Sequence, residues 1–369
     1  WGSWAYSQYE SLVLLQVTSI TGMYGISFLI AWFASVGNWA WERDFEWSEV
    51  RGGGTAFVLT FATVLLIGGV RLMLGTSDCQ TVRVASITKP DLELMTPDAA
   101  AELATGTTLT AAALDGVRSR ADDINTFLFE RSEREARAGA KLVFWGEANG
   151  FALKSDEPQL VARGVELARS NQIHLGMAIG VWNQESPKPL ENKIILINPQ
   201  GEIVLNTLKA IPVPGGEAAI SARGDGRIKS VVTPIGRIGA AICFDMDFPS
   251  LIAEAGQQQV DILLAPSNDW QAIDPWHTHM ARFRAVEQGF NLVRHTSLGL
   301  SVATDCRSRV LASMDHYETE DRVLVAQVPT AGVPTIYSKV GDLFVWICIA
   351  GSVVLTMFSR RSGRGDDRS

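Results

Sequence analysis

Three uncharged, apolar runs stand out along the chain, one pair near the start and one close to the end. They are residues 11–41 (31 residues), 52–70 (19 residues, with apolar character continuing to Leu74) and 343–359 (17 residues). A membrane-spanning helix needs roughly 17–25 mainly apolar residues. The runs therefore predict transmembrane helices at about 11–41, 52–74 and 342–359. Long buried helices of a soluble protein are the alternative.

Basic residues next to these runs predict how the chain crosses the membrane. Arg43 and Arg51 lie between the first two runs, and Arg360, Arg361, Arg364 and Arg368 follow the third. Loops and tails rich in Lys and Arg stay on the cytoplasmic side. We therefore expect a membrane region at 1–75, an extracytoplasmic domain at 76–340, and a last helix with a basic cytoplasmic tail at 341–369. Tryptophans near the ends of the first run fit an interfacial aromatic belt; they are Trp1, Trp4, Trp32, Trp39, Trp41 and Trp47.

The region between the second and third runs alternates strand-like and helix-like patterns, which predicts an α/β fold. The predicted strands are 81–87, 141–145, 174–182, 193–198, 202–205, 228–233, 238–244, 261–265, 291–295 and 300–304. The predicted helices are 112–138, 159–169, 249–257 and 276–289. Several of these strands end in polar residues before a helix, which is typical of an α/β site.

Composition supports a folded domain joined to apolar segments. The 369 residues are 47% apolar with a net charge of −8 and a mean hydropathy of +0.11, which excludes a disordered chain. Outside the three runs the charged fraction is about 24%, close to the usual value for a soluble domain. The acidic balance argues against a nucleic-acid partner.

Chemically capable side chains follow three predicted strands: Glu147, Lys209 and Cys243. A cysteine nucleophile needs help to ionise near neutral pH, and a neighbouring ammonium together with a carboxylate base supplies it. Each residue alone has an ordinary structural reading, since a buried Cys packs and strand-end Lys and Glu are usually solvated. As a set they predict nucleophilic catalysis.

The residues around the cysteine, GRIGAAICFDMDFP at 236–249, resemble the nitrilase (carbon-nitrogen hydrolase) superfamily. Within it, further strings resemble the apolipoprotein N-acyltransferase family over essentially the whole chain. These strings are YSQ at 6–8, ITGMYGISFL at 20–29, SND at 267–269, MARFRAVE at 280–287 and TIYSKVGD at 335–342. The family has additional N-terminal transmembrane helices, and the chain begins with Trp rather than Met. We therefore expect those helices to be missing here.

The resemblance implies a nitrilase-like α-β-β-α sandwich flanked by transmembrane helices. It implies a Glu147–Lys209–Cys243 catalytic triad with Glu217 as a second essential glutamate. Phe244 and Asp245 stand where the family usually has Tyr and Glu, with a role beside the nucleophile and in the oxyanion site, and Gly146 replaces a usual Pro. The implied substrate-binding residues are Asn268 and Trp270.

The implied reaction moves an acyl chain from a membrane phospholipid, through a Cys243 thioester, to the α-amine of the diacylglyceryl-cysteine of a lipoprotein. The implied partners are these two lipids and the bilayer, for a monomeric enzyme of the bacterial inner membrane without a cofactor. A membrane-tethered amidase that uses the same triad with water as acceptor is the alternative, and an inactive scaffold is a third interpretation.

The remaining features carry ordinary interpretations. His277 and His279 form an HxH pair, for which a structural role is favoured over zinc, so no metal site is predicted. Cys348 lies in the third run, whereas Cys79 and Cys306 would be able to pair outside the cytoplasm if they are close in space. The Gly-rich segment 213–226 fits either a mobile lid or an ordinary surface loop.

Overall fold

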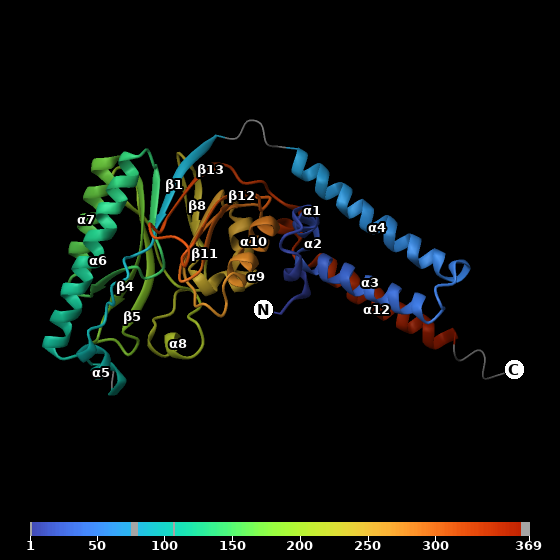
Figure 1. Cartoon of the computed structure of the whole chain (residues 1–369), viewed down its shortest axis with the longest axis horizontal. Helices are drawn as coiled ribbons and strands as arrows, with labels where there is room; N and C mark the ends of the chain where they lie inside the picture. Colours follow the sequence, from blue (N-terminus) through green and yellow to red (C-terminus); the bar gives the residue numbers. More distant parts are fainter. Residues whose placement is uncertain (1, 75–79, 106–107, 363–369) are drawn as a thin grey trace.

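The computed structural model describes residues 2–74, 80–105 and 108–362, and its centre is a pair of β-sheets packed face to face (Figure 1). The first sheet has the strand order β13-β1-β2-β4-β5-β6, with β3 paired to β4. Its strands are β1 (Thr81–Ile87), β2 (Leu142–Trp145), β3 (Gly150–Leu153), β4 (His174–Trp182), β5 (Leu190–Ile197), β6 (Ile203–Leu208) and β13 (Val323–Pro329).

The second sheet has the order β12-β11-β10-β9-β8-β7. Its strands are β7 (Lys229–Thr233), β8 (Gly236–Ala240), β9 (Ile262–Asn268), β10 (Asn291–Ser297), β11 (Leu300–Thr304) and β12 (Val310–Asp315). The central strands β8, β9 and β10 run parallel, so the loops that follow them lie at one edge of the sheet.

Alternating side chains explain why these strands form two packed layers. In β2, Leu142 and Phe144 point into the core between the sheets, whereas Val143 and Trp145 point to the helices outside. Successive side chains of a strand face opposite sides, so a strand that is apolar at every position is covered on both faces. Ile262 and Leu264 of β9 reach the same central core from the second sheet.

Helices cover both outer faces (Figure 1). α6 (Ala111–Arg137) and α7 (Glu157–Asn171) pack on the first sheet, and α9 (Pro249–Gln257) and α10 (Trp276–Gln288) pack on the second. The predicted α-β-β-α sandwich is confirmed. Shorter helices complete the domain; they are α5 (Pro97–Thr105), α8 (Gly216–Ile220) and α11 (Ile336–Val340).

The apolar runs form helices that extend away from the second sheet, here called the apolar helices (Figure 1). They are α1 (Leu12–Leu15), α2 (Thr18–Thr21), α3 (Met23–Trp41), α4 (Trp47–Met73) and α12 (Leu343–Ser362), preceded by the 3-10 helix η1 (Trp4–Gln8). Among the described residues, α4 is long and apolar enough to cross a bilayer. α12 contributes a shorter apolar stretch, Leu343–Phe358.

The first uncharged run does not form one straight helix. Leu12–Thr21 and Met23–Trp41 meet at an angle of 114°, so together they form either a broken span or a re-entrant segment. The bend lies at Gly22, whose φ of +65° favours glycine, and a Cβ there would come within 2.6 Å of the Tyr337 ring. The three membrane crossings therefore stay a prediction, as does the side of the membrane on which the sandwich lies.

Helix α10 joins the sandwich to the apolar helices. Met280, Phe283 and Val286 pack against residues of η1 and of α1 to α4, while Ala281 and Ala285 face the second sheet. The same helix carries a buried ion pair between Arg284 Nη1 and Glu287 Oε2, 2.8 Å apart. Glu287 Oε1 also accepts a hydrogen bond of 2.8 Å from the backbone N–H of Met23, directly after the bend. One helix thus contacts both parts of the molecule.

Candidate active site

Three chain segments bring the predicted triad to one end of the sandwich. Glu147 follows β2, Lys209 follows β6, and Cys243 opens the 3-10 helix η2 (Cys243–Asp247) after β8. Lys209 Nζ lies 2.8 Å from Glu147 Oε1, and the charges of both residues act on the Cys243 thiol. The three side chains are buried, so their charges interact with little screening by water.

Lys209 is the centre of a compact charge cluster. Its Nζ also lies 2.9 Å from Oε1 and 2.8 Å from Oε2 of Glu217. Burial alone would lower the pKa of Lys209, but the charges of Glu147, Cys243 and Glu217 raise it well above its ordinary value. The side chain therefore stays an ammonium at neutral pH. The structure brings Glu217 together with the predicted triad.

Asn192 is a member of this cluster that sequence reasoning missed. Its Nδ2 donates to Glu147 Oε1 at 2.7 Å and to Glu217 Oε1 at 3.2 Å, so one amide bridges the two carboxylates. Its backbone carbonyl accepts from the backbone N–H of Lys209 at 2.8 Å. The predicted strand began three residues too late, at 193, because β5 starts at Leu190. A polar amide two residues before the buried Ile194 would have indicated a side chain facing the site.

Cys243 occupies an unusual backbone conformation. Its φ is +47°, in the left-handed region that costs a non-glycine residue about 1 kcal/mol or more. The predicted strand 238–244 is wrong at its end, because β8 stops at Ala240 and the chain turns into η2. This turn presents the sulfur at the end of the sheet, 4.0 Å from the carbonyl oxygen of Asn268.

The Cys243 thiol is protonated at rest. Burial raises its pKa well above the ordinary value, and the negative charges of Glu147 and Asp269 add to this effect. Lys209 and Arg294 oppose it with their positive charges. A buried thiol of this kind reacts as a nucleophile only when a base accepts its proton. Glu147 is the carboxylate of the triad that is available for that step.

Asp245 ties two loops of the site together. Its Oδ2 accepts hydrogen bonds from the backbone N–H groups of Ile242 at 3.0 Å and Ala210 at 3.3 Å, and its Oδ1 accepts from Ile211 at 2.8 Å. Burial raises the pKa of Asp245 to about 6, although these N–H groups work in the opposite direction. The carboxylate thus holds the segment after Lys209 against the turn of Cys243.

Asp245→Ala is therefore expected to loosen both loops. Several buried N–H groups lose their acceptor, which should lower the free energy of unfolding by about 2–4 kcal/mol. A small displacement of Lys209 relative to Cys243 should slow the reaction on the order of 100-fold. Chemical unfolding and the rate of covalent labelling at Cys243 measure the two effects. Asp225→Ala, at an exposed carboxylate, is the control, and equal behaviour of the two variants would refute this role.

Of the other predicted site residues, Asn268 lines a cavity beside Glu147, whereas Phe244 and Trp270 do not. The ring of Phe244 packs edge-on against Phe248, with centroids 5.1 Å apart. Asn268 and Glu147 line one cavity of about 360 Å³, together with residues such as Asn149, Leu298 and His316. Trp270 is 49% exposed and is not among the residues that line this cavity. Asn149 is a further missed residue, since its Nδ2 donates to the carbonyl of Glu147 at 3.0 Å.

The segment predicted as a lid or a surface loop contains the short helix α8. Lys188 Nζ donates to the carbonyls of Ala218 and Ala219 at 2.7 and 2.8 Å, which anchors this helix from outside. Glu217, at its start, accepts from the backbone N–H of Val213 at 2.7 Å. The segment therefore holds the carboxylate of Glu217 against the ammonium of Lys209.

The predicted Cys79–Cys306 pair involves Cys79, which lies outside the described residues.

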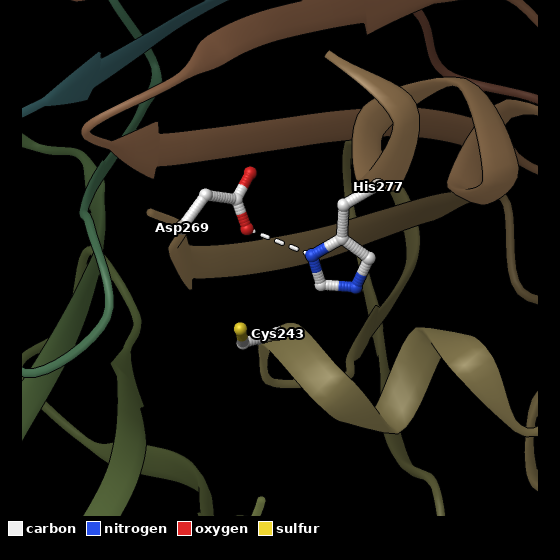
Figure 2. A group of neighbouring side chains, drawn as sticks. All are labelled: Cys243, Asp269 and His277. Carbon is white, nitrogen blue, oxygen red and sulfur yellow. Dashed lines mark hydrogen bonds and ion pairs between the residues drawn. The ribbon is translucent and has the colours of Figure 1, made fainter. Parts of the chain in front are cut away.

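One group of side chains has the chemistry of metal ligands. Sγ of Cys243, an oxygen of Asp269 and a ring nitrogen of His277 lie within 4.8 Å of one another (Figure 2). Arg294 Nη2, however, is 2.8 Å from both Asp269 Oδ1 and His277 Nδ1. A guanidinium on the same atoms opposes binding of a metal cation, so we assign no metal to these residues.

Comparison with known proteins places this geometry in context. The carbon-nitrogen hydrolase family matches residues 84–336. The chain is 26% identical over 391 residues to the apolipoprotein N-acyltransferase of Geobacter metallireducens, which covers 98% of this chain and 70% of that protein. It is 25% identical over 396 residues to the protein of the same name from Bradyrhizobium diazoefficiens, covering 99% and 70%. For the relative from Vibrio vulnificus the identity is 27%, covering 60% and 49%.

Solved structures show the same fold. An amidase from Nesterenkonia sp. aligns with a TM-score of 0.52 at 17% identity, over 70% of this chain and 94% of that chain. A cysteine-to-serine mutant of a Nesterenkonia amidase of the nitrilase superfamily aligns with a TM-score of 0.52 at 16% identity, over 70% and 94%. The alignments cover nearly the whole amidase, whereas about 30% of this chain lies outside them.

Proposed function

The chain belongs to the carbon-nitrogen hydrolase family, and from this premise we propose that it is an apolipoprotein N-acyltransferase. The proposed reaction carries an acyl chain from a membrane phospholipid to the α-amine of a lipoprotein's diacylglyceryl-cysteine. The observation that carries the proposal is a buried Glu–Lys–Cys site packed in one unit with apolar helices. Two relatives with this name match along nearly the whole chain, which spans about 70% of each of them. Another relative with this name matches 60% of the chain, over about half of its own length.

The first half of the proposed cycle forms a thioester. Glu147 accepts the proton of Cys243, and the sulfur attacks the ester carbonyl of the phospholipid. Lys209 Nζ lies within 2.9 Å of one oxygen of Glu147 and both oxygens of Glu217, and its positive charge is the first proposed stabiliser of the developing oxyanion. The backbone N–H of Phe244 is the second proposed donor. The C–O bond then breaks, and the leaving lysophospholipid alkoxide takes the proton from Glu147.

The second half transfers the acyl group to nitrogen. The lipoprotein amine attacks the thioester carbonyl, Glu147 removes a proton from the amine, and the C–S bond breaks. The products are an amide and the Cys243 thiolate, which regains its proton from Glu147. Glu217 supports both halves by holding Lys209 in place.

Both proposed substrates are lipids, which explains why a soluble-type sandwich is joined to apolar helices. The basic residues around these helices support an extracytoplasmic catalytic domain in a bacterial inner membrane. We propose that the enzyme acts there as a monomer, with Asn268 and Trp270 at the substrate side of the site.

One assay tests the proposed function. The purified full chain is incubated with phospholipid that carries a labelled acyl chain and with a diacylated lipopeptide. Labelled triacylated peptide is the expected product. Release of ammonia from small amides without lipid labelling would contradict the proposal and favour the amidase. A protein that is folded but inactive in both assays would favour the inactive scaffold.

A further inference from the structure

A second group of buried charges lies beside Cys243 and has no part in the proposed mechanism. It consists of Asp247 in η2, Asp269 after β9, His277 in α10 and Arg294 in β10. Figure 2 shows Asp269 and His277 joined by a hydrogen bond, with the Cys243 sulfur close to both. Four separate parts of the fold thus contribute charged side chains to one group beside Cys243.

His277 stands between two carboxylates. Its Nδ1 lies 2.7 Å from Asp269 Oδ1, and its Nε2 lies 3.0 Å from Asp247 Oδ1. The two carboxylates stabilise a doubly protonated, positively charged ring, which is able to donate to both of them, while Arg294 Nη2, 2.8 Å from the same Nδ1, opposes this charge. Burial and Arg294 lower the pKa of His277, but the hydrogen bonds to Asp247 and Asp269 outweigh them and raise it.

The charges of the group cancel only when His277 is charged. Asp247 and Asp269 contribute two negative charges, and Arg294 contributes one positive charge through the 2.8 Å contact between its Nη2 and Asp269 Oδ1. A neutral His277 would leave one excess negative charge next to the sulfur. Asp269 already acts against ionisation of Cys243, so this excess would make the thiolate harder to form.

We infer that His277 is a positioning residue for Cys243: it joins the turn of the nucleophile to Asp269, and its positive charge balances the carboxylates that oppose ionisation of the thiol. The inference rests on the proposed role of Cys243 as nucleophile. Asp247, Asp269 and Arg294 face His277 from the elements packed against it, while Glu147 and Lys209 act on the same sulfur from the first sheet.

The test measures the thiol itself and needs no acyl transfer. The full chain carries Cys79→Ser, Cys306→Ser and Cys348→Ser, so that Cys243 is its one thiol. Its alkylation by iodoacetamide is followed by intact mass from pH 5 to 11. His277→Gln should move the midpoint of this profile upward by about one pH unit, which slows alkylation about tenfold below the midpoint.

A double variant separates charge from structure. In His277→Gln with Asp269→Asn the excess negative charge is gone, so the midpoint should return toward that of the parent chain. Glu147→Gln, which removes a negative charge, should move the midpoint downward and shows that the assay detects neighbouring charges. His279→Gln is the matched control, because His279 is a neighbouring buried imidazole of the same helix that stacks on Tyr9, with centroids 3.8 Å apart.

The inference is overturned if folded His277→Gln protein keeps the parent midpoint, whatever its limiting rate. It is also overturned if the double variant shifts as far as the single one, since only damage to the fold would then be measured. Circular dichroism confirms that each variant is folded. A failure of acyl transfer would leave this outcome unchanged, so the proposed function and the role of His277 are tested separately.

Discussion

Cys243→Ala is expected to abolish the acyl-enzyme and to lower turnover on the order of 10⁴-fold or more. The alanine has no atom that is able to form the thioester, and the buried carboxylate and ammonium would have no nucleophile to activate. Wild-type protein incubated with phospholipid alone should gain the mass of one acyl chain. Intact-mass analysis of both proteins measures this adduct directly.

Cys306→Ala is the matched control for this experiment. Cys306 is also a buried thiol, but it follows β11 and its sulfur lies 3.6 Å from Arg307 Nη1, outside the charge cluster of Lys209. This variant should keep the adduct. An acyl adduct on Cys243→Ala, or none on the wild type, would contradict the thioester mechanism.

Local pattern predicted the sheet strands well where burial is continuous. The predicted bounds of β1, β4, β11 and α9 agree with the structure. The three strands are rich in apolar residues, and α9 begins at Pro249, a residue that favours the first helical position. The strands β3, β12 and β13 were missed. β13 pairs antiparallel with β1, more than 200 residues earlier in the chain, and its alternating burial depends on that distant partner.

The break in the first apolar run shows a similar limit. Hydropathy is continuous across Gly22, so the sequence predicts one long helix. The bend lies at Gly22, where Tyr337 of α11, more than 300 residues later in the chain, leaves no room for a side chain. Hydropathy detects an apolar environment but contains no information on such a contact.

The candidate site was only partly predictable, because some of its residues meet through contacts between segments that are distant in the sequence. The fourfold group of Glu147, Lys209, Glu217 and Cys243 followed from recognisable strings around each residue. The positions of Asn192 and Asp245 and the charges around His277 follow from contacts between distant strands. No pattern within a single segment predicts that Asp269, His277 and Arg294 meet.

Lys209→Met is expected to have the second-largest effect, on both chemistry and stability. Without the ammonium, Glu147 and Glu217 face each other across the Asn192 amide, and two such carboxylates cannot both stay ionised. A protonated Glu147 is no base, and one oxyanion donor is lost. The rate of adduct formation should therefore fall on the order of 1,000-fold or more.

The chain offers a matched control for this substitution in Lys193. It is also a buried lysine between two glutamates: its Nζ contacts Glu157 and lies 2.7 Å from Glu191 Oε2, and none of the three belongs to the Lys209 cluster. Removing one partner of a buried ion pair costs about 3–5 kcal/mol. Chemical unfolding should show a loss of this size for Lys209→Met and a similar or smaller loss for Lys193→Met, because Glu157 and Glu191 are partly exposed.

The two variants should differ mainly in the rate at which they form the acyl adduct. Lys193→Met should form the acyl adduct at nearly the wild-type rate, because Glu157 and Glu191 keep Lys154 as a partner and the charges that act most on Cys243 are those of Glu147, Lys209, Asp269 and Arg294. Lys209→Met should form almost none, even under conditions where the same fraction of each protein is folded. Equal loss of adduct in both variants would mean that Lys209 acts through stability alone, and the proposed oxyanion role would be wrong.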